Sequence, residues 1–315
     1  MPSTLPDTLT LIRQLIAEPS VSSCNPAHDL SNLAVIHLLA EWAETLGFAV
    51  EIRPISPTKA NLIATLGNSE NPGGLVLSGH TDTVPCNPER WHSDPFKATI
   101  RDERLYGLGS ADMKSFFALA LAAATRFEAR QLQQPLVILA TADEESTMQG
   151  ARTLLAENAC LGRYAVIGEP TGLKPVRMHK GIAMNAVTVR GKAGHSSDPA
   201  QGANAIEGMR VILGELLAFA ETLKQRHRHP AFKVDHPTLN LGAIHGGDNP
   251  NRICDRCEVH FDMRLLPGMS LTALHQELEE WMHQGLLTTP GLSLEISQLF
   301  AGIPAFETAA DEVDP

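Results

Sequence analysis

The sequence predicts an α/β protein with an inserted α+β unit. Residues 3–181 alternate apolar helical segments with short apolar strands, which is typical of a mostly parallel sheet covered by helices. Residues 182–299 instead follow the order β-α-β-β-α-β, which is the ferredoxin-like arrangement. We therefore expect a first domain at residues 1–181, an inserted domain at residues 182–299, and a return of the chain to the first domain at residues 300–315.

Helical periodicity and apolar runs predict the elements of the first domain. A helix over residues 30–46 should stop at Gly47, because glycine readily adopts the left-handed conformation that ends helices. A second helix, rich in alanine and leucine, is predicted over residues 113–129. The predicted strands cover residues 49–54, 61–66, 74–78, 136–140 and 164–167.

The inserted domain is predicted from the same signals. Two helices should pack on one sheet of four strands, as the ferredoxin-like order requires. The helices are expected near residues 199–225 and 270–286, and the strands at residues 183–190, 238–245, 252–266 and 292–299.

Charge and hydrophobic pattern disfavour both a nucleic-acid partner and a membrane partner. The formal net charge of −11, from 25 basic and 36 acidic residues, disfavours a nucleic acid, because phosphate binding depends on basic side chains. The basic run at residues 224–229 ends a predicted helix and is interpreted as a solvated helix end. No apolar stretch reaches the ~18 residues of a membrane span, and the N-terminus lacks the pattern of a signal peptide. We therefore expect a cytoplasmic protein without a membrane partner.

The five cysteines support the same location. Their number is odd and they are scattered, which favours reduced thiols over a disulfide framework. Cys254 and Cys257 form a C-x-x-C pair, but they lie in a strand-like run without a second pair. We interpret both as strand residues and not as a zinc knuckle.

Residues able to bind a metal follow apolar strands at several places in the first domain. His80 and Asp82 come two residues apart just after the strand at residues 74–78, so their side chains should point to the same side. Functional sites in open α/β sheets form where strands end. Four further acids occupy comparable positions: Asp112, Glu144, Glu145 and Glu169.

Each of these residues also has a simpler interpretation. A single histidine at a strand end is usually a core residue, and an aspartate before a helix, such as Asp112, is usually an N-cap. Glu169 alone would be a surface acid, and Glu144 with Glu145 a solvated pair. Together and in order, however, an imidazole and several carboxylates suit a pair of divalent ions, with one glutamate left as a general base. The pattern therefore predicts a metal-dependent hydrolase.

Longer motifs around these residues extend the interpretation. Six motifs lie between residues 79 and 268: GHTDTVP, LYGLGSADMK, ATADEES, IGEPTGLKPVRMHKG, GHSSDPAQGANAIE and LNLGAIHGGDNPNRICDRCEVHFDMRLLPG. With them the sequence resembles the M20 family of zinc metallopeptidases and deacylases, from near its start to its last residues. The resemblance implies a zinc-hydrolase catalytic domain with an inserted ferredoxin-like dimerisation domain, and hence a homodimer.

The resemblance also implies a ligand set for two zinc ions per subunit. His80 and Glu169 would bind one ion, Asp112 would bridge both, and Glu145 would bind the other. Cobalt or manganese would suit the same imidazole and carboxylate donors.

Three catalytic roles follow from the same resemblance. Glu144 would be the general base, and Asp82 would hydrogen-bond the outer nitrogen of His80 and so fix its tautomer. His195 would reach the active site of the partner subunit and stabilise the oxyanion there. On spacing alone, His195 could instead belong to a turn before a helix.

Substrate contacts are implied for three residues. Asn251 and Arg264 would hold polar groups of the substrate, and Lys180 would lie near its carboxylate. Arg264 could equally form an ordinary ion pair at a strand end.

The implied activity is hydrolysis of N2-acetyl-L-ornithine to L-ornithine and acetate, a step of arginine biosynthesis. Two alternatives stay open: the same chemistry on succinyl-diaminopimelate or a dipeptide, and a truncated, non-catalytic dimerising protein. Family members carry a late histidine after the inserted domain that completes the second zinc's ligands. Here the last histidine is His283, in a predicted helix, so we expect a shortened version of a longer enzyme.

Overall fold

The computed structural model describes residues 5–68, 73–286 and 290–309, and the chain forms two compact units. The first unit comprises residues 1–173 and the second comprises residues 174–315. The sequence instead predicts three segments, with boundaries after residues 181 and 299, and this finer division stays a proposal.

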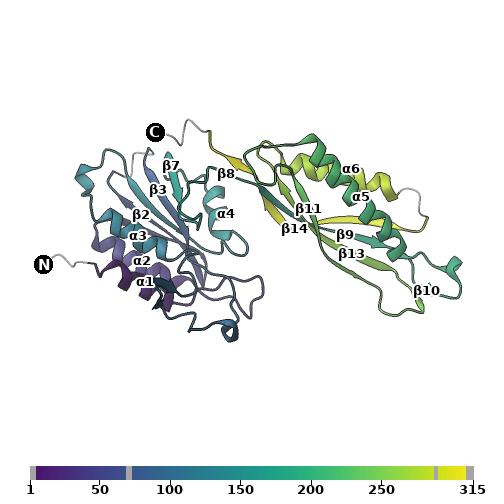
Figure 1. Ribbon diagram of the computed structural model, residues 1–315, viewed down its shortest axis with the longest axis horizontal. Helices are drawn as coiled ribbons and strands as arrows, with labels where there is room; N and C mark the ends of the chain where they lie inside the picture. The colour runs from purple at the N-terminus through teal and green to yellow at the C-terminus, as the bar shows by residue number, and fades with distance from the viewer. Residues whose placement is uncertain (1–4, 69–72, 287–289, 310–315) are drawn as a thin grey trace. The chain divides into compact units, whose positions relative to one another are not determined.

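A five-stranded sheet forms the centre of the first unit (Figure 1). Its strand order is β1-β2-β6-β3-β7. The bounds are β1 (Ala49–Ser56), β2 (Lys59–Leu66), β3 (Leu75–His80), β6 (Leu136–Thr141) and β7 (Tyr164–Ile167). β3 pairs in parallel with both β6 and β7, whereas β2 is antiparallel to both β1 and β6. The sheet is thus more mixed than expected, because the two-residue connection between β1 and β2 allows only a hairpin.

Helices cover both faces of this sheet. α1 (Thr8–Ala17), α2 (Leu33–Thr45) and α3 (Ser115–Ala124) lie on one face, and α4 (Gln149–Ala156) lies on the other (Figure 1). Alternation along β2 explains both cores: Leu62 packs with the three helices, and its neighbour Ile63 packs with Leu154 of α4. The central strands β2 and β6 are therefore buried on both sides, as the α/β prediction requires, whereas β7 is exposed.

The helices of the first unit differ from expectation mainly in length. α2 ends just before Gly47, whose φ of 83° is the predicted left-handed stop. α3 is shorter than the predicted range of residues 113–129, because the N–H groups of Arg126 and Phe127 bond to carbonyls three residues back and tighten the last turn. The remaining elements are short: η1 (Pro88–Arg90), β4 (Thr99–Arg101), β5 (Arg104–Tyr106) and η2 (Ala129–Gln131).

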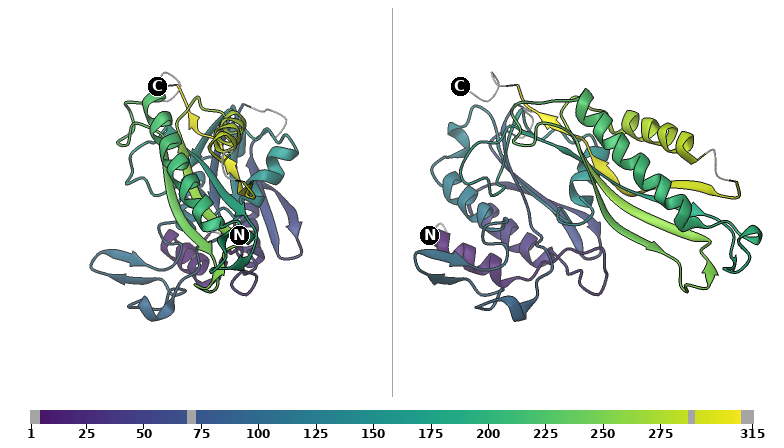
Figure 2. Two further views of the ribbon diagram at one scale, coloured as in Figure 1. Left: turned by 90° about the vertical axis from the view of Figure 1, so that its right-hand side faces the viewer. Right: turned by 45° about the vertical axis from the view of Figure 1, so that its right-hand side comes forward.

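The second unit has the predicted ferredoxin-like order. β9 (Gly181–Arg190), β11 (Thr238–Gly246), β13 (Arg256–Leu265) and β14 (Ser293–Ile303) form an antiparallel sheet in the order β11-β13-β9-β14. α5 (Ala205–Arg226) and α6 (Leu271–Leu286) pack side by side on one face (Figure 2). The rings of Phe219 and Trp281 meet at 5.6 Å between these helices, so the two helices share one core with the sheet.

Short elements adjust the predicted bounds of this unit. α5 begins at Ala205 because the side chain of Asn204 caps it, and residues 199–201 form the separate turn η3 (Pro199–Gln201). The predicted strand at residues 252–266 is divided into β12 (Arg252–Ile253) and β13. β12 pairs with β10 (Gly194–His195), and β15 (Phe306–Glu307) pairs with β8 (Met178–His179).

Two smaller expectations can also be followed in the structure. Cys254 and Cys257 are both buried free thiols; Cys257 lies in β13, and Cys254 lies in the break before it. Among the helices of the described residues, none has the length and apolar character needed to cross a lipid bilayer.

Candidate metal centre

The predicted metal-binding residues of the first unit gather at the carboxyl ends of β3, β6 and β7. His80 ends β3, and its Nε2 lies 2.9 Å from Asp112 Oδ1, 3.8 Å from Glu169 Oε1 and 4.0 Å from Glu144 Oε2. These three strands are parallel neighbours, so the residues that follow them emerge at the same edge. The register therefore brings together groups that lie far apart in the sequence.

Two overlapping sets of side chains could each hold an ion. The ligand atoms of His80, Asp112 and Glu169 lie within 4.8 Å of one another, and so do those of His80, Glu144 and Glu145. The first set matches the ligands expected for one ion. The second contains Glu145, expected as a ligand, together with Glu144, expected as the base. Their individual roles stay predictions.

Asp82 links the histidine to the two glutamates. Its carboxylate is fully buried and accepts the backbone N–H of Glu144 at 3.2 Å and that of Glu145 at 3.0 Å. His80 Nδ1 lies 3.0 Å from the backbone oxygen of Asp82 and 3.6 Å from its carboxylate. The nearer partner of the outer nitrogen is thus the carbonyl, and the carboxylate mainly holds the glutamate turn.

The electrostatics of the cluster favour positive charge. Burial alone lowers the pKa of His80, but the carboxylates of Asp82, Glu144 and Glu169 outweigh it and raise that pKa to about 10. Among the described residues, His80 is the only basic side chain that forms an ion pair with Asp112, Glu144 or Glu169. An excess of clustered carboxylate of this kind is stabilised by a cation.

The acids themselves are displaced toward the protonated form. Burial, and then repulsion from Glu169 and Glu145, raise the pKa of Glu144 to about 7. Burial also raises the pKa of Glu145 and of Glu169, and for both the charge of Asp112 adds to the effect. A carboxyl that titrates near neutral pH is suited to general acid–base catalysis.

Two glycines let α3 approach the strand ends closely. A Cβ on Gly79 would lie 2.8 Å from Met113 Cε, and one on Gly168 would lie 2.1 Å from Phe116 Cγ. These glycines immediately precede His80 and Glu169. A larger residue at Gly168 would force the Phe116 ring or α3 to shift, whereas at Gly79 the flexible end of Met113 would have to move aside.

The four predicted residues of the second unit lie at two ends of its sheet. Lys180 immediately precedes β9, and Arg264 in β13 pairs with Ile182 near the same end. His195 lies in β10, and Ser196 donates to the backbone oxygen of Asn251. Because β9 has 10 residues, at about 3.3 Å each, the two pairs are separated by roughly 30 Å.

These side chains already have partners within the unit. Lys180 Nζ donates to the backbone oxygen of His236 at 2.6 Å, and burial lowers its pKa. Arg264 Nε donates to Asp262 Oδ1 at 2.9 Å, and His195 Nδ1 lies 2.8 Å from Ser197 Oγ. The contact between Arg264 and Asp262 is the ordinary strand-end ion pair that the sequence allowed as an alternative to substrate binding.

The sequence interpretation missed the residues that anchor the turn carrying Glu144 and Glu145. Asp143 precedes the two glutamates, and its carboxylate binds Lys59 and Ser22. Two signals could have indicated this: Asp143 opens a run of three acids, and Lys59 opens an otherwise largely apolar strand.

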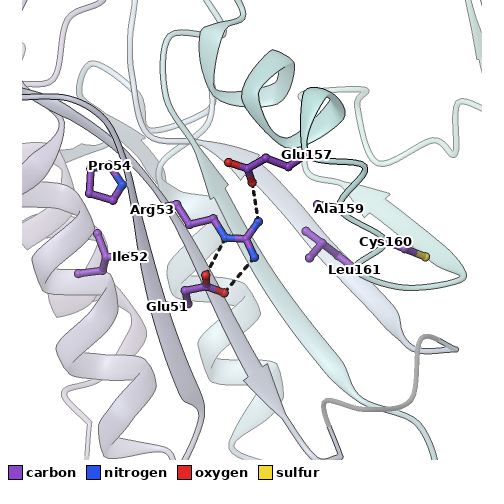
Figure 3. A pocket seen from close by; sticks show the side chains of 8 residues that line it. All are labelled: Glu51, Ile52, Arg53, Pro54, Glu157, Ala159, Cys160 and Leu161. Atoms are coloured by element: carbon purple, nitrogen blue, oxygen red, sulfur yellow. Dashed lines mark hydrogen bonds and ion pairs between the residues drawn. The ribbon is translucent and has the colours of Figure 1, made fainter.

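A separate hollow of about 610 Å³ lies between β1 and the residues after α4 (Figure 3). Arg53 crosses it and bonds to Glu51 at 2.8 Å and to Glu157 at 2.9 Å. None of the predicted site residues lines this hollow, and its arginine is already paired on both sides. It offers no free charged group comparable to the metal cluster.

Comparison with known proteins agrees with this geometry. Residues 177–290 match the peptidase dimerisation domain, and residues 61–167 match peptidase family M28. The acetylornithine deacetylase of Yersinia pestis is 49% identical over 98% of this chain and 80% of its own length. That of Proteus mirabilis is 48% identical over 98% of this chain and 79% of its own. The chain belongs to the acetylornithine deacetylase family.

Solved structures show the same fold at much lower identity. An M20 family metallo-carboxypeptidase from Sulfolobus solfataricus is 17% identical, with a TM-score of 0.72 over 98% of this chain and 80% of that one. A dinuclear metal-binding M20 peptidase from Bacillus subtilis is 15% identical, with a TM-score of 0.65 over 96% and 75%. The family and its fold make the protein a metal-dependent amidohydrolase.

Proposed function

We propose that the protein hydrolyses N2-acetyl-L-ornithine to L-ornithine and acetate, in arginine biosynthesis, with two zinc ions per subunit. One observation carries the proposal: an imidazole and four carboxylates converge at one sheet edge in a chain 49% identical to acetylornithine deacetylases. Cobalt or manganese would fit the same donors.

The cluster suits divalent ions by its charge and its donors. His80, Asp112 and Glu169 would hold one ion. Asp112 and Glu145, whose charges interact, would hold the other. When bound, such ions polarise an amide carbonyl and make a water molecule more acidic.

The protein's own groups would move the proton. Glu144 would take a proton from the attacking water as the oxygen bonds to the acetyl carbon. As the carbon–nitrogen bond breaks, Glu144 would return that proton to the leaving amine. Asp82 would keep the base oriented, since its carboxylate holds the backbone N–H of Glu144.

We also propose a homodimer with a shared active site. His195 and Asn251 lie at one end of the second unit, and Lys180 and Arg264 lie at the other. One small substrate cannot touch both ends within a single chain. The partner subunit's His195 would therefore stabilise the oxyanion, while Lys180 and Arg264 of the same chain would hold the carboxylate and polar groups of the substrate.

A cytoplasmic location is part of the proposal. All five cysteines are free thiols, as is usual for proteins of reducing compartments.

An acetate-release assay with N-acetylornithine, with and without added zinc, tests the activity. We expect kcat/KM for N-acetylornithine to exceed that for N-succinyl-diaminopimelate and for dipeptides by at least about 100-fold. A preference for either competitor would replace the proposed substrate. Calorimetric titration with zinc tests the non-catalytic alternative, which tight binding of two ions per chain would contradict.

A further inference from the structure

Lys59 is a buried cation outside the proposed ligand set. It opens β2, and its side chain is 5% exposed. Its ammonium lies 2.8 Å from Asp29 Oδ1 and 2.7 Å from Asp143 Oδ1. Burying an ammonium group is costly unless it is fully paired, and an apolar side chain could fill the same space. The charge therefore calls for a reason beyond packing.

Asp143 is the organising residue of the turn that follows β6. Its φ of 58° is left-handed, a conformation that few residues other than glycine adopt. Its backbone oxygen accepts the N–H groups of Thr147 at 3.1 Å and Met148 at 2.6 Å. Its side chain accepts the hydroxyl of Ser22 at 3.0 Å as well as the ammonium of Lys59. The conformation of the turn thus depends on where the Asp143 carboxylate is held.

The same turn carries Glu144 and Glu145. Their backbone N–H groups are held by the carboxylate of Asp82, and the neighbouring Asp143 is held by Lys59. Ser22 adds a further link, because its hydroxyl bonds both to Asp143 and to the hydroxyl of Ser146.

We propose that Lys59 is a positioning residue that acts through Asp143 to set the direction of Glu144 and Glu145. The inference rests on the proposed function and names a further residue that this function requires. Without the ammonium, three consecutive carboxylates would repel one another, and Asp143 would turn toward water. The turn would then leave its left-handed conformation, and the two glutamates would move with it. Misplacement of a catalytic group by about 1 Å can cost roughly 100-fold in rate.

Lys59→Met tests the role, because methionine keeps the length of the side chain and removes its charge. In the zinc-loaded full chain we expect kcat to fall at least 10-fold, with KM within about 3-fold of wild type. Amide hydrogen exchange at residues 144–148, measured without substrate, should accelerate at least 10-fold. The matched control is Arg53→Met, which removes a cation paired with two carboxylates at the hollow of Figure 3. It should leave both readouts unchanged.

Asp143→Ala provides a second test, which keeps both residues of the Lys59–Asp29 pair. If Lys59→Met does not fold, this variant tests the positioning role by itself. It should lower kcat and accelerate the same exchange to a similar degree. The double variant, with Lys59→Met and Asp143→Ala, should have a kcat no more than about 3-fold below that of the less active single variant, because both substitutions act on one turn.

Normal kcat and normal exchange in Lys59→Met or in Asp143→Ala would overturn the inference, and so would fully additive losses in the double variant. A wild-type protein that releases no acetate would overturn the proposed function instead. In that case the exchange readout, which needs no substrate, would still decide whether Lys59 positions the turn.

Discussion

The two units arrange their predicted functional residues in opposite ways. In the first unit, three carboxylates from other segments lie within 4.0 Å of His80 Nε2. Those of Glu144 and Glu169 follow strands parallel to β3 that end at the same edge, and Asp112 precedes α3. In the second unit, an antiparallel sheet carries two pairs of residues at its two ends. The first unit therefore brings its groups together within one chain, whereas the second keeps its two pairs apart, which is the basis for our proposal that a second copy shares the site. Each experiment below tests one side of this contrast.

The largest effect is expected at the convergent site. Glu144→Gln removes the base but keeps a side chain of the same shape, so the variant should retain its metal. We expect kcat to fall about 10²- to 10⁴-fold, as is usual when a general base is removed. Turnover at the wild-type rate, with metal content confirmed by elemental analysis, would show that Glu144 is not the base.

The second unit should respond in a way that one chain alone cannot. His195→Ala should lower kcat by about 100- to 1,000-fold, the range for loss of an oxyanion donor. Mixing it with Glu144→Gln should restore about a quarter of wild-type activity, since half of the random dimers contain one intact site of two. If subunit exchange is verified and the mixture stays as inactive as its parents, the shared site is wrong.

A smaller effect is expected from the packing that brings Asp112 to the cluster. Gly168→Ala places a Cβ 2.1 Å from Phe116 Cγ, so the Phe116 ring or α3 must shift. We expect a loss of about 1–3 kcal/mol in unfolding free energy and weaker zinc binding. Gly214→Ala is the control, because its Cβ would meet no atom within 4 Å in the helix α5, and it should stabilise by about 0.5–1 kcal/mol. Equal zinc affinity in both variants would contradict the close-approach argument.

The smallest effect concerns two histidines in contrasting surroundings. The acids around His80 raise its pKa, whereas burial beside Asn185 and Gln298 lowers the pKa of His275 below 6.5. A histidine with a lowered folded-state pKa stabilises the fold above its unfolded pKa, so stability should be lost as the pH falls below 6.5.

His275→Gln keeps a polar group in that network and should reduce this acid dependence. Denaturant unfolding of the wild type and the variant, at about pH 7.5 and about pH 5.5, measures it. If both proteins lose the same free energy of unfolding between these pH values, the acid sensitivity arises from other groups.

The sequence predicted most elements because their signals are local. Apolar runs placed β7 at Tyr164–Ile167, and Gly47 marked the end of α2. The end of α3 was not predictable, since the apolar pattern continues beyond Ala124 while the backbone tightens. The mixed pairing was also missed, because a strand's direction depends on which neighbour it joins.

The candidate site was likewise predicted only in part, where local signals mark its residues. His80, Glu144, Glu145 and Glu169 were found because each follows an apolar run. The anchoring of their turn by Lys59 was not, since 84 residues separate it from Asp143 and no short motif contains both.

The amino-acid sequence by itself determined the chemistry of the protein: one imidazole and several carboxylates at strand ends, in two units of different architecture. Only the tertiary structure decided how those groups are held. Asp82 supports the glutamates through their backbone N–H groups, and Lys59 supports them through a neighbouring acid. The physical reason is that residue type sets which bonds a group can form, whereas long-range pairing of strands sets which partners come within reach.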